Sequence, residues 1–195
     1  MEYQQLIALI TFAFVSTVSP GPNNIMLMTS GANVGFMRTI PHMLGITFGF
    51  SLMVALVGFG LIGLFTAYPV VQQGLRIASM LYLLYLAVKI AKSKPMTNQA
   101  SDYKPMSFLS AASFQWVNPK AWTMALTAIS VYATSAEPQD ILLVSLIFGL
   151  VNVPSVSLWT TAGKQLQGIL QAPTKIKIFN YSMASLLVFS IVPML

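Results

Sequence analysis

Two stretches of the chain, between Glu2 and Arg38 and between His42 and Arg76, each contain more than thirty consecutive residues without a full charge. A helix that crosses a bilayer needs about 20 predominantly apolar residues, so each stretch is long enough to span a membrane. Only 7% of the 195 residues are charged and 56% are hydrophobic, whereas a soluble domain carries about 25% charged residues. The sequence therefore predicts an integral membrane domain.

The sequence lacks the side chains on which several other functions depend. Its ten basic residues, which give a net charge of +6, are spread between neutral runs and do not form the basic face of a nucleic-acid-binding protein. There is no cysteine and a single histidine, His42, which disfavours disulfides and multi-histidine metal sites. Neither His-Glu-x-x-His nor Gly-x-Ser-x-Gly occurs, so we expect no metal, no cofactor and no enzyme activity.

Apolar runs separated by charges and helix breakers divide the chain into six expected spans. The runs are continuously apolar, which favours helices over a closed β-barrel with alternating residues. The spans are expected at about 4–34, 43–66, 70–91, 107–133, 140–161 and 178–195. The first run begins with Glu2 instead of a basic residue, which disfavours a cleaved secretory signal.

A polar stretch near the middle of the chain separates three spans from three. We expect a first repeat at about 1–91, a cytoplasmic loop at about 92–106 and a second repeat at about 107–195. Because each repeat has an odd number of spans, the two would be inverted relative to each other in the membrane. The sequence thus predicts an all-α fold of six transmembrane helices in a single transmembrane domain of two inverted three-helix repeats.

Basic residues predict the orientation, because basic loops stay in the cytoplasm. The first, third and fifth loops carry Arg38, Lys89, Lys92, Lys94, Lys104, Lys164, Lys175 and Lys177. The fourth loop instead carries Glu137 and Asp140, so we expect both chain termini outside. Arg76 does not fit this pattern; it either snorkels from the third span to the outer surface or serves the protein interior.

Helix breakers stand at corresponding places in the two repeats. The first span contains Ser19-Pro20-Gly21-Pro22-Asn23-Asn24, and the fourth contains Asn118-Pro119-Lys120. Interrupted hydrophobic segments at matching positions of two halves indicate the binding site of a transporter. A proline disrupts a helix interior but fits as the first residue of a new helix. We therefore expect broken first and fourth helices, restarting at Pro22 and Pro119.

Two helix amino ends would then meet near the middle of the bilayer. Each carries roughly half a positive charge and unpaired amide donors, which attract an anionic group such as a carboxylate. Lys120 lies about 20 Å into the fourth span, where a lysine is costly and needs a partner. That partner would be a substrate carboxylate, a backbone carbonyl or water. If the span ends are misplaced by a turn, Lys120 would snorkel to the surface instead.

The fifth span adds further polar candidates. Asn152 and Pro154 interrupt it near its middle. Together with Ser19, Asn23 and Asn24, Asn152 would supply the polar lining that holds an ammonium group.

The second span is rich in glycine. Gly45 and Gly49 have the spacing of closely packed helices, either within one protomer or between the two protomers of a homodimer. Gly58, Gly60 and Gly63 follow them.

Four motifs occur in an order that matches a known family. They are the Ser19–Asn24 motif, the glycine-spaced second span, Tyr82-Leu83-Leu84-Tyr85-Leu86-Ala87-Val88-Lys89 in the third span, and Asn118-Pro119-Lys120-Ala121 in the fourth. Over nearly its whole length the chain resembles the LysE/RhtB family of amino-acid exporters. The resemblance implies a secondary transporter that exports an amino acid or close derivative across the bacterial inner membrane, driven by the proton gradient. The branch most similar to the chain exports neutral solutes such as cysteine, O-acetylserine, homoserine or threonine.

The chain departs from the family pattern in two ways. Its final span stops at Leu195 without the basic tail of many relatives, so the sixth helix is expected to be marginal in length. No carboxylate lies within an expected span, which argues against a carboxylate-based proton antiport. His42, expected at the inner mouth of the second span, is the one side chain suited to change charge near neutral pH. It would be either an interface anchor or a proton-coupling group.

The hypothesis from sequence is therefore a transporter that works by alternating access, with its substrate held between Pro22 and Asn118–Pro119 and the substrate carboxylate facing Lys120. The expected partners are a small amino-acid substrate, protons and membrane lipid. Nucleic acid is not expected. The alternative is a membrane channel or a scaffold subunit without carrier activity.

Overall fold

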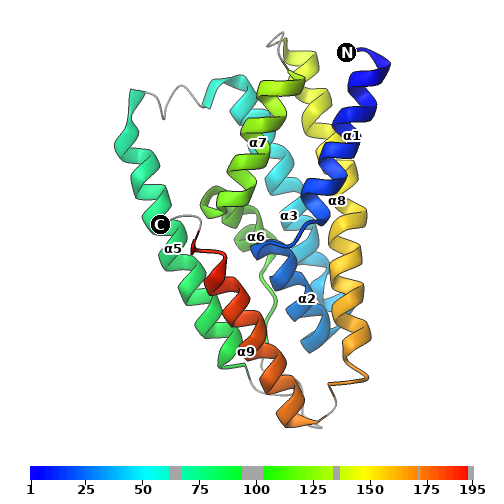
Figure 1. The fold of residues 1–195 in the computed structure, drawn as a ribbon, viewed down its shortest axis with the longest axis vertical. Coiled ribbons are helices and arrows are strands. Elements are labelled where there is room, and N and C mark those ends of the chain that lie inside the picture. The colour runs from blue at the N-terminus through cyan, green and yellow to red at the C-terminus, as the bar shows by residue number, and fades with distance from the viewer. Residues whose placement is uncertain (62–66, 94–102, 134–136, 171, 193–195) are drawn as a thin grey trace.

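The computed structural model describes residues 1–61, 67–93, 103–133, 137–170 and 172–192, whose arrangement is shown in Figure 1. Over these residues the chain forms helices and no strand. In chain order they are α1 (Tyr3–Val18), α2 (Pro22–Val34), α3 (Phe36–Leu56), η1 (Val57–Leu61), α5 (Pro69–Ala91), α6 (Phe108–Phe114), η2 (Gln115–Val117), α7 (Pro119–Tyr132), α8 (Pro138–Leu166) and α9 (Pro173–Phe189). The expected all-helical fold is confirmed for the described part of the chain.

Several of these helices have the length and hydropathy of membrane spans. By these two criteria, Phe36–Leu61, Gln73–Ala91 and Pro138–Leu166 each qualify alone. The bent pair α1 and α2 qualifies as a fourth span if it is counted as one. These four lie in the first, second, third and fifth expected spans, while α6 to α7 and α9 occupy the other two.

The helix ends differ from the expected span ends in three places. α3 begins at Phe36 and not near 43, because Gly35 adopts a positive φ of 80° that ends α2 and lets the next helix start at once. α8 continues to Leu166, beyond the expected end at 161, and α9 begins at Pro173, ahead of 178. Both α8 and α9 start with a proline in the first turn, a position that suits its fixed φ.

The helix in the segment expected as the sixth span is short. α9 has 17 residues, or about 25 Å at 1.5 Å per residue, whereas the hydrocarbon core of a bilayer is about 30 Å thick. This length agrees with the expectation of a marginal sixth helix. The expected end of the span at 195 lies outside the described residues, as do Gly63, Lys94 and most of the expected loop at 92–106.

The first span is broken between α1 and α2, which are bent by 57° relative to each other. α1 ends at Val18 and α2 begins at Pro22, so the predicted breakers form the link between them. Pro22 occupies the first turn of α2, where its missing N–H removes no helical hydrogen bond. The proline-broken first span is therefore present as expected.

The segment expected as the fourth span is broken as well. α6 has seven residues and passes through the 3-10 turn η2 before α7 begins at Pro119. Asn118 caps α7, and its side-chain oxygen accepts a hydrogen bond from the backbone N–H of Lys120 at 3.2 Å. In Figure 1, α2 descends from its break and α7 rises from its own. The amino ends of both helices thus start near the middle of the molecule.

The fifth span is not broken, so the expected interruption at Asn152 and Pro154 was wrong. α8 is continuous from Pro138 to Leu166 with Pro154 inside it. A proline in a membrane helix costs one backbone hydrogen bond, which packing against neighbouring helices can offset. α1, α2 and α3 pack against α8. These neighbours keep the helix continuous on both sides of the proline.

α8 packs on α1, α2 and α3, and glycines let α2 approach it closely. A Cβ added at Gly31 would lie 2.2 Å from the carbonyl oxygen of Thr160. One added at Gly163 would lie 2.1 Å from the carbonyl oxygen of Met28. The backbones of α2 and α8 therefore pack in direct contact in the C-terminal halves of both helices.

α5 and α9 pack against each other along one side of the bundle (Figure 1). Buried Leu83, Ala87 and Leu187 belong to the cluster between them. Arg76 of α5 is exposed, which favours its surface interpretation over a role in the interior.

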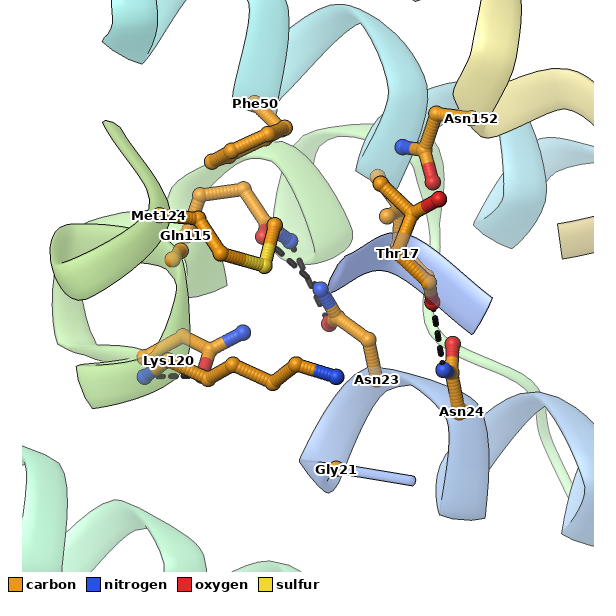
Figure 2. A pocket seen from close by; sticks show the side chains of 12 residues that line it. Thr17, Gly21, Asn23, Asn24, Phe50, Gln115, Lys120, Met124 and Asn152 are labelled. Atoms are coloured by element: carbon orange, nitrogen blue, oxygen red, sulfur yellow. Dashed lines mark hydrogen bonds between the residues drawn. The ribbon is translucent and has the colours of Figure 1, made fainter. Parts of the chain in front are cut away.

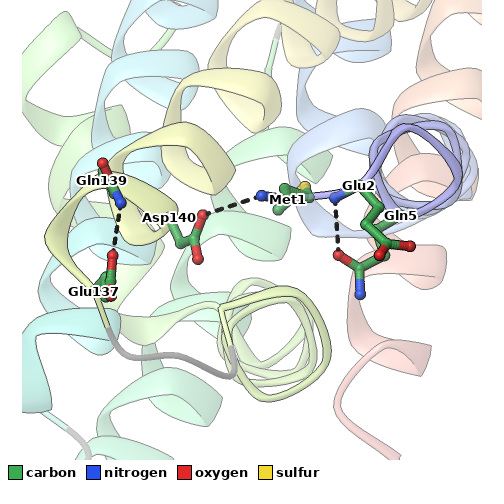
Figure 3. Close-up of polar contacts among 6 residues, drawn as sticks. All are labelled: Met1, Glu2, Gln5, Glu137, Gln139 and Asp140. Carbon is green, nitrogen blue, oxygen red and sulfur yellow. Dashed lines mark hydrogen bonds and ion pairs between the residues drawn. The ribbon is translucent and has the colours of Figure 1, made fainter.

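The two ends of the bundle carry opposite charges. Figure 3 shows the N-terminal end, where the Met1 amino group lies 3.9 Å from Asp140 Oδ1 and Gln139 donates a hydrogen bond to Glu137. Glu2 lies at the same end. The opposite end, where α2, α5 and α8 finish and α3 and α9 begin, carries Arg38, Lys89, Lys92, Lys104, Lys164, Lys175 and Lys177. The sequence predicts this separation of acidic and basic residues from the charges of its expected loops.

The glycine pair of the second span packs within the protomer. A Cβ at Gly45 would lie 2.3 Å from the carbonyl oxygen of Phe108, and one at Gly49 would lie 2.5 Å from the Cα of Ala112. Both glycines therefore face α6 of the same chain. A homodimer stays a prediction. The spacing of Gly45 and Gly49 does not support it, because both glycines pack within the chain.

We expect Gly45→Ala to lower the free energy of unfolding by about 1–3 kcal/mol, because the added methyl group would overpack the α3–α6 contact. Gly74→Ala is the matched control, since no atom lies within 4 Å of its added Cβ and alanine favours a helix interior by up to about 1 kcal/mol. Unfolding of both variants in detergent, followed by circular dichroism, makes the comparison. Equal losses of stability would contradict the α3–α6 packing.

Candidate functional site

A small cavity lies where the two helix breaks meet, and Figure 2 shows its lining. Its volume of about 30 Å³ has room for a water molecule or two. It is lined by Thr17, Gly21, Asn23, Asn24, Ile46, Phe50, Gln115, Asn118, Lys120, Ala121, Met124 and Asn152. The lining therefore comes from both breaks and from the middles of α3 and α8.

The structure brings the residues predicted for substrate binding together from both halves of the chain. Those that line the cavity are Gly21, Asn23, Asn24, Asn118, Lys120 and Asn152. The remaining ones, Ser19, Pro20, Pro22 and Pro119, are their neighbours in the two links. Their clustering is a structural observation, while their role in binding stays a prediction.

Sequence reasoning missed half of the lining. The missed residues are Thr17, Ile46, Phe50, Gln115, Ala121 and Met124. Gln115 carried a signal, because it is a polar side chain one turn before Asn118 in an apolar span. Ile46 and Phe50 carried none, since an apolar residue of a membrane helix can face lipid, another helix or a cavity.

Lys120 reaches across the cavity to the carboxyl end of α1. Its Nζ donates hydrogen bonds to the backbone oxygen of Ser19, to Ser19 Oγ at 2.9 Å and to the backbone oxygen of Pro20 at 3.4 Å. Gly21 leaves room for this reach, because a Cβ there would lie 2.7 Å from Lys120 Cδ. Backbone carbonyl oxygens, one of the three kinds of partner expected for Lys120, accept hydrogen bonds from it, and the carboxyl end of a helix attracts a cation.

Side chains satisfy the backbone carbonyls that the first break leaves without a helical partner. Asn24 Nδ2 donates to the carbonyl oxygens of Thr17 and Ser19, each at 2.8 Å, and Trp159 Nε1 donates to that of Val18 at 3.0 Å. Lys120 completes the set at Ser19 and Pro20. The amide nitrogen of Asn24 thus serves the backbone, while the predicted role of its side chain toward a substrate ammonium group stays a prediction. The backbone carbonyl groups at the end of α1 and in the link are thus paired with side-chain donors.

An amide pair joins the two breaks directly. Asn23 Nδ2 donates to Gln115 Oε1 at 2.8 Å, and Gln115 Nε2 donates back to Asn23 Oδ1 at 3.3 Å. Gln115 also donates to the carbonyl oxygen of Ala111 at 2.8 Å. Figure 2 shows this pair beside the cavity, with Phe50 and Met124 next to it. The position of α2 is therefore coupled to that of η2 and α7.

The electrostatics of the cavity favour an anion on one side. The N-cap residues of α2 and α7, Gly21 and Asn118, both line it, so two electropositive helix ends face it together with the Lys120 ammonium. The acidic residues of the described ranges lie at the N-terminal end of the bundle, away from the cavity. No three His, Cys, Asp or Glu side chains in those ranges come together as a group that could hold a metal ion.

The opposite side of the cavity is mostly apolar. Ile46, Phe50 and Met124 line it, and the ring of Phe50 packs edge-on against Phe148 at 5.4 Å between centroids. Asn152 adds an amide whose atoms point toward Thr17 in Figure 2. A ligand with a carboxylate, a small neutral side chain and a hydrogen-bonding ammonium group matches these three surfaces.

His42 does not line this cavity. It was expected at the mouth of a span, but its side chain is 0% exposed, inside α3. The earlier start of α3 at Phe36 explains the difference, because it places His42 in the second turn of the helix, within the bundle.

We expect Asn24→Ala to lower the free energy of unfolding by about 1–3 kcal/mol, because it leaves buried carbonyl groups at the break without their donor. Gln139→Ala removes an exposed amide at the end of the bundle and should change stability by less than about 0.5 kcal/mol. Chemical unfolding in mixed micelles measures both. An Asn24 variant as stable as the Gln139 variant would show that the break does not depend on this amide.

Sequence comparison finds a family and individual proteins that are similar to this chain over almost its full length. The LysE type translocator family matches residues 14–192. A cysteine/O-acetylserine efflux protein of Klebsiella pneumoniae subsp. pneumoniae is 30% identical over 187 residues, which cover 93% of this chain and 92% of that protein. A protein of the same name from Escherichia coli (strain K12) is 28% identical over 166 residues, or 83% of each chain. No solved structure is significantly similar. The family resemblance is thereby confirmed, and the chain belongs to the LysE type translocator family.

Proposed function

We propose that this protein exports a small neutral amino acid, or a close derivative of one, from the cytoplasm and that it binds this substrate in the cavity between the two helix breaks. Two relatives named as cysteine/O-acetylserine efflux proteins support this substrate class; homoserine and threonine are chemically similar candidates. The observation that carries the proposal is the meeting of Lys120 with two helix amino ends in a cavity that no described carboxylate faces.

The substrate carboxylate would take over the contacts that Lys120 now makes with α1. The ammonium group of Lys120 is held by neutral oxygens of Ser19 and Pro20, and a carboxylate is a stronger partner because its hydrogen bonds are charge-assisted. The first-turn amides of α2 and α7 would add donors to the same carboxylate. Binding would therefore release the carboxyl end of α1 from α7.

The remaining surfaces of the cavity fit the rest of such a substrate. The amide oxygens of Asn23, Gln115 and Asn152 can accept hydrogen bonds from the substrate ammonium group. The apolar wall around Phe50 and Met124 suits a short side chain without charge. An acidic or basic side chain would be desolvated there without an opposite charge, which costs several kcal/mol.

The helix packing supports two inverted repeats of three spans each. Counted from each break, α3 and α8 are the second spans of the two repeats, and α5 and α9 are the third. α3 packs on α8 and α5 packs on α9, as a pseudo-two-fold axis through the molecule would require. Repeat one would comprise about 1–91, and repeat two about 107–195.

Transport would proceed by alternating access. The cavity is smaller than any amino acid, at about 30 Å³, so the two repeats must move apart to admit the substrate. Loss of the Lys120 contacts with Ser19 would free the link between α1 and α2, and one repeat could then rock against the other around the site.

The protein would lie in the bacterial inner membrane with its basic end in the cytoplasm. The acidic end, with the N-terminus, would then face outside, and α9 would rise from the basic end toward the same side. Exposed apolar side chains of α5 and α9, such as Leu81 and Phe189, would contact lipid.

Replacement of Lys120 tests the proposal. In proteoliposomes that exchange labelled cysteine or O-acetylserine against an excess of the unlabelled compound, we expect Lys120→Met to lose counterflow. Loss of a charge-assisted hydrogen bond alone, worth about 1.5–3 kcal/mol, lowers affinity by roughly 10-fold to 100-fold. Lys164→Met, at the exposed end of α8, is the matched control and should keep counterflow.

Two controls make the outcome decisive. The unfolding transition of Lys120→Met in detergent shows that a loss of counterflow does not come from misfolding. Counterflow by Lys120→Met equal to that of the unchanged protein would remove Lys120 from the site. A folded, unchanged protein that shows no counterflow with any neutral amino acid would favour a channel or scaffold subunit.

A further inference from the structure

A second polar cluster is buried between the cavity and the basic end of the bundle. On α3, His42, Ile46 and Phe50 are four residues apart and lie on one face of the helix. Ile46 and Phe50 line the cavity, so His42 lies one turn, or about 6 Å along the helix, closer to the basic end. On α2, Ser30 lies two turns beyond Asn23 in the same direction.

Hydrogen bonds link His42 toward the basic end. Ser30 Oγ lies 3.5 Å from His42 Nδ1 and 3.0 Å from the hydroxyl group of Tyr103. Both His42 and Ser30 are 0% exposed. Tyr103 lines a separate small cavity together with Lys89 and Lys104, which belong to the basic end. A chain of three polar groups thus runs from the interior of α3 to the cytoplasmic side in the proposed orientation.

The other nitrogen of His42 has no hydrogen-bond partner among the residues that the structure describes. His42 Nε2 is buried without a hydrogen bond, and so is Ser155 Oγ of α8. Ser155 lies three residues beyond Asn152, which lines the substrate cavity. A buried polar atom without a partner costs about 1–3 kcal/mol, so its retention calls for a physical reason. Proton binding at Nε2 would be such a reason.

Few other charged groups lie close to His42. On its own helix, Arg38 is one turn away and exposed. Lys104, next to Tyr103, and Lys164 of α8 are also exposed. The acidic residues of the described ranges lie at the far end of the bundle. Tyr103 is therefore the titratable side chain that the hydrogen-bond chain connects to the imidazole.

We propose that His42 is the proton-binding site that couples export to the proton gradient, and that Ser30 and Tyr103 form the path by which the proton leaves to the cytoplasm. This inference rests on the proposed export function. A proton from the cavity side binds at Nε2 and makes the imidazolium. The imidazolium passes its Nδ1 proton to Ser30, Ser30 passes its own proton to Tyr103, and Tyr103 releases one to water. One proton thus enters and one leaves, and reorientation of the hydroxyl groups and the imidazole restores the starting state.

The experiment compares two modes of transport in the same proteoliposomes. Counterflow of labelled cysteine or O-acetylserine reports exchange without net proton movement. Uptake driven by an acidic lumen reports antiport, because protons leave as the label enters. The quantity measured is the ratio of gradient-driven uptake to counterflow, for His42→Gln, for Tyr103→Phe and for Ser79→Ala. Ser79 is the matched control, since its buried hydroxyl group bonds only to the carbonyl oxygen of Leu75 in its own helix among the described contacts.

We expect the ratio measured for His42→Gln to fall to the value found without a gradient. The ratio for Tyr103→Phe should fall part of the way, and the ratio for Ser79→Ala should equal that of the unchanged protein. A His42→Gln protein that keeps the full ratio overturns the proposal. So does an unchanged protein that shows counterflow without any response to the gradient. An unchanged protein without counterflow contradicts the export function itself, which separates the two failures.

A second measurement covers the case in which the His42 variant does not fold. Because the chain has one histidine, nitrogen NMR of the histidine-labelled protein in a bilayer reports His42 alone. We expect the signal to change when substrate binds and when the pH is lowered, because protonation or a change of tautomer alters both ring nitrogens of a histidine. An imidazole that stays neutral and in one tautomer under all these conditions overturns the proposal.

Discussion

A bilayer contains no water to satisfy backbone groups, so a helix that breaks inside it must have each freed carbonyl and amide paired by the protein. The link between α1 and α2 meets this requirement in full on its carbonyl side. From Ser16 to Gly21 every backbone carbonyl accepts a hydrogen bond, from Ser19, Asn24, Trp159, Lys120 or the next helix. These donors come from α2, α7 and α8 as well as from the link itself. The position of the first break is therefore fixed by contacts that draw the centre of the bundle together.

The polar residues at the site are of two kinds. Asn24 and Trp159 hold the backbone with donors that no ligand could replace without undoing the break. Lys120 differs, because its neutral oxygen partners are weaker than a carboxylate. In the proposed mechanism the same ammonium group closes the empty site and recognises the substrate. Exchange of one partner for the other then couples binding to the movement of α1, and the buried His42 cluster one turn below would couple that movement to a proton.

The sequence predicts the broken spans well, because Pro22 and Pro119 act through local covalent geometry. It also singles out Lys120, since a long apolar run contains this residue, and the structure places its ammonium group at the first break. It fails at Pro154, where the outcome depends on α1, α2 and α3 packing around α8 and not on the proline itself. Ile46 and Phe50 were missed for a similar reason, as only the tertiary fold shows which face of an apolar helix meets a cavity. The burial of His42 followed from a helix start set by the positive φ of Gly35, which the glycine-rich sequence does not single out.

An experimental structure of the protein with bound cysteine or O-acetylserine tests the central claim most directly. We expect the substrate to lie between the two breaks, with its carboxylate at Lys120 Nζ in place of the Ser19 oxygen and within reach of the first-turn amides of α2 and α7. A bound substrate elsewhere, with Lys120 still held by Ser19 and the link between α1 and α2 unchanged, would contradict it.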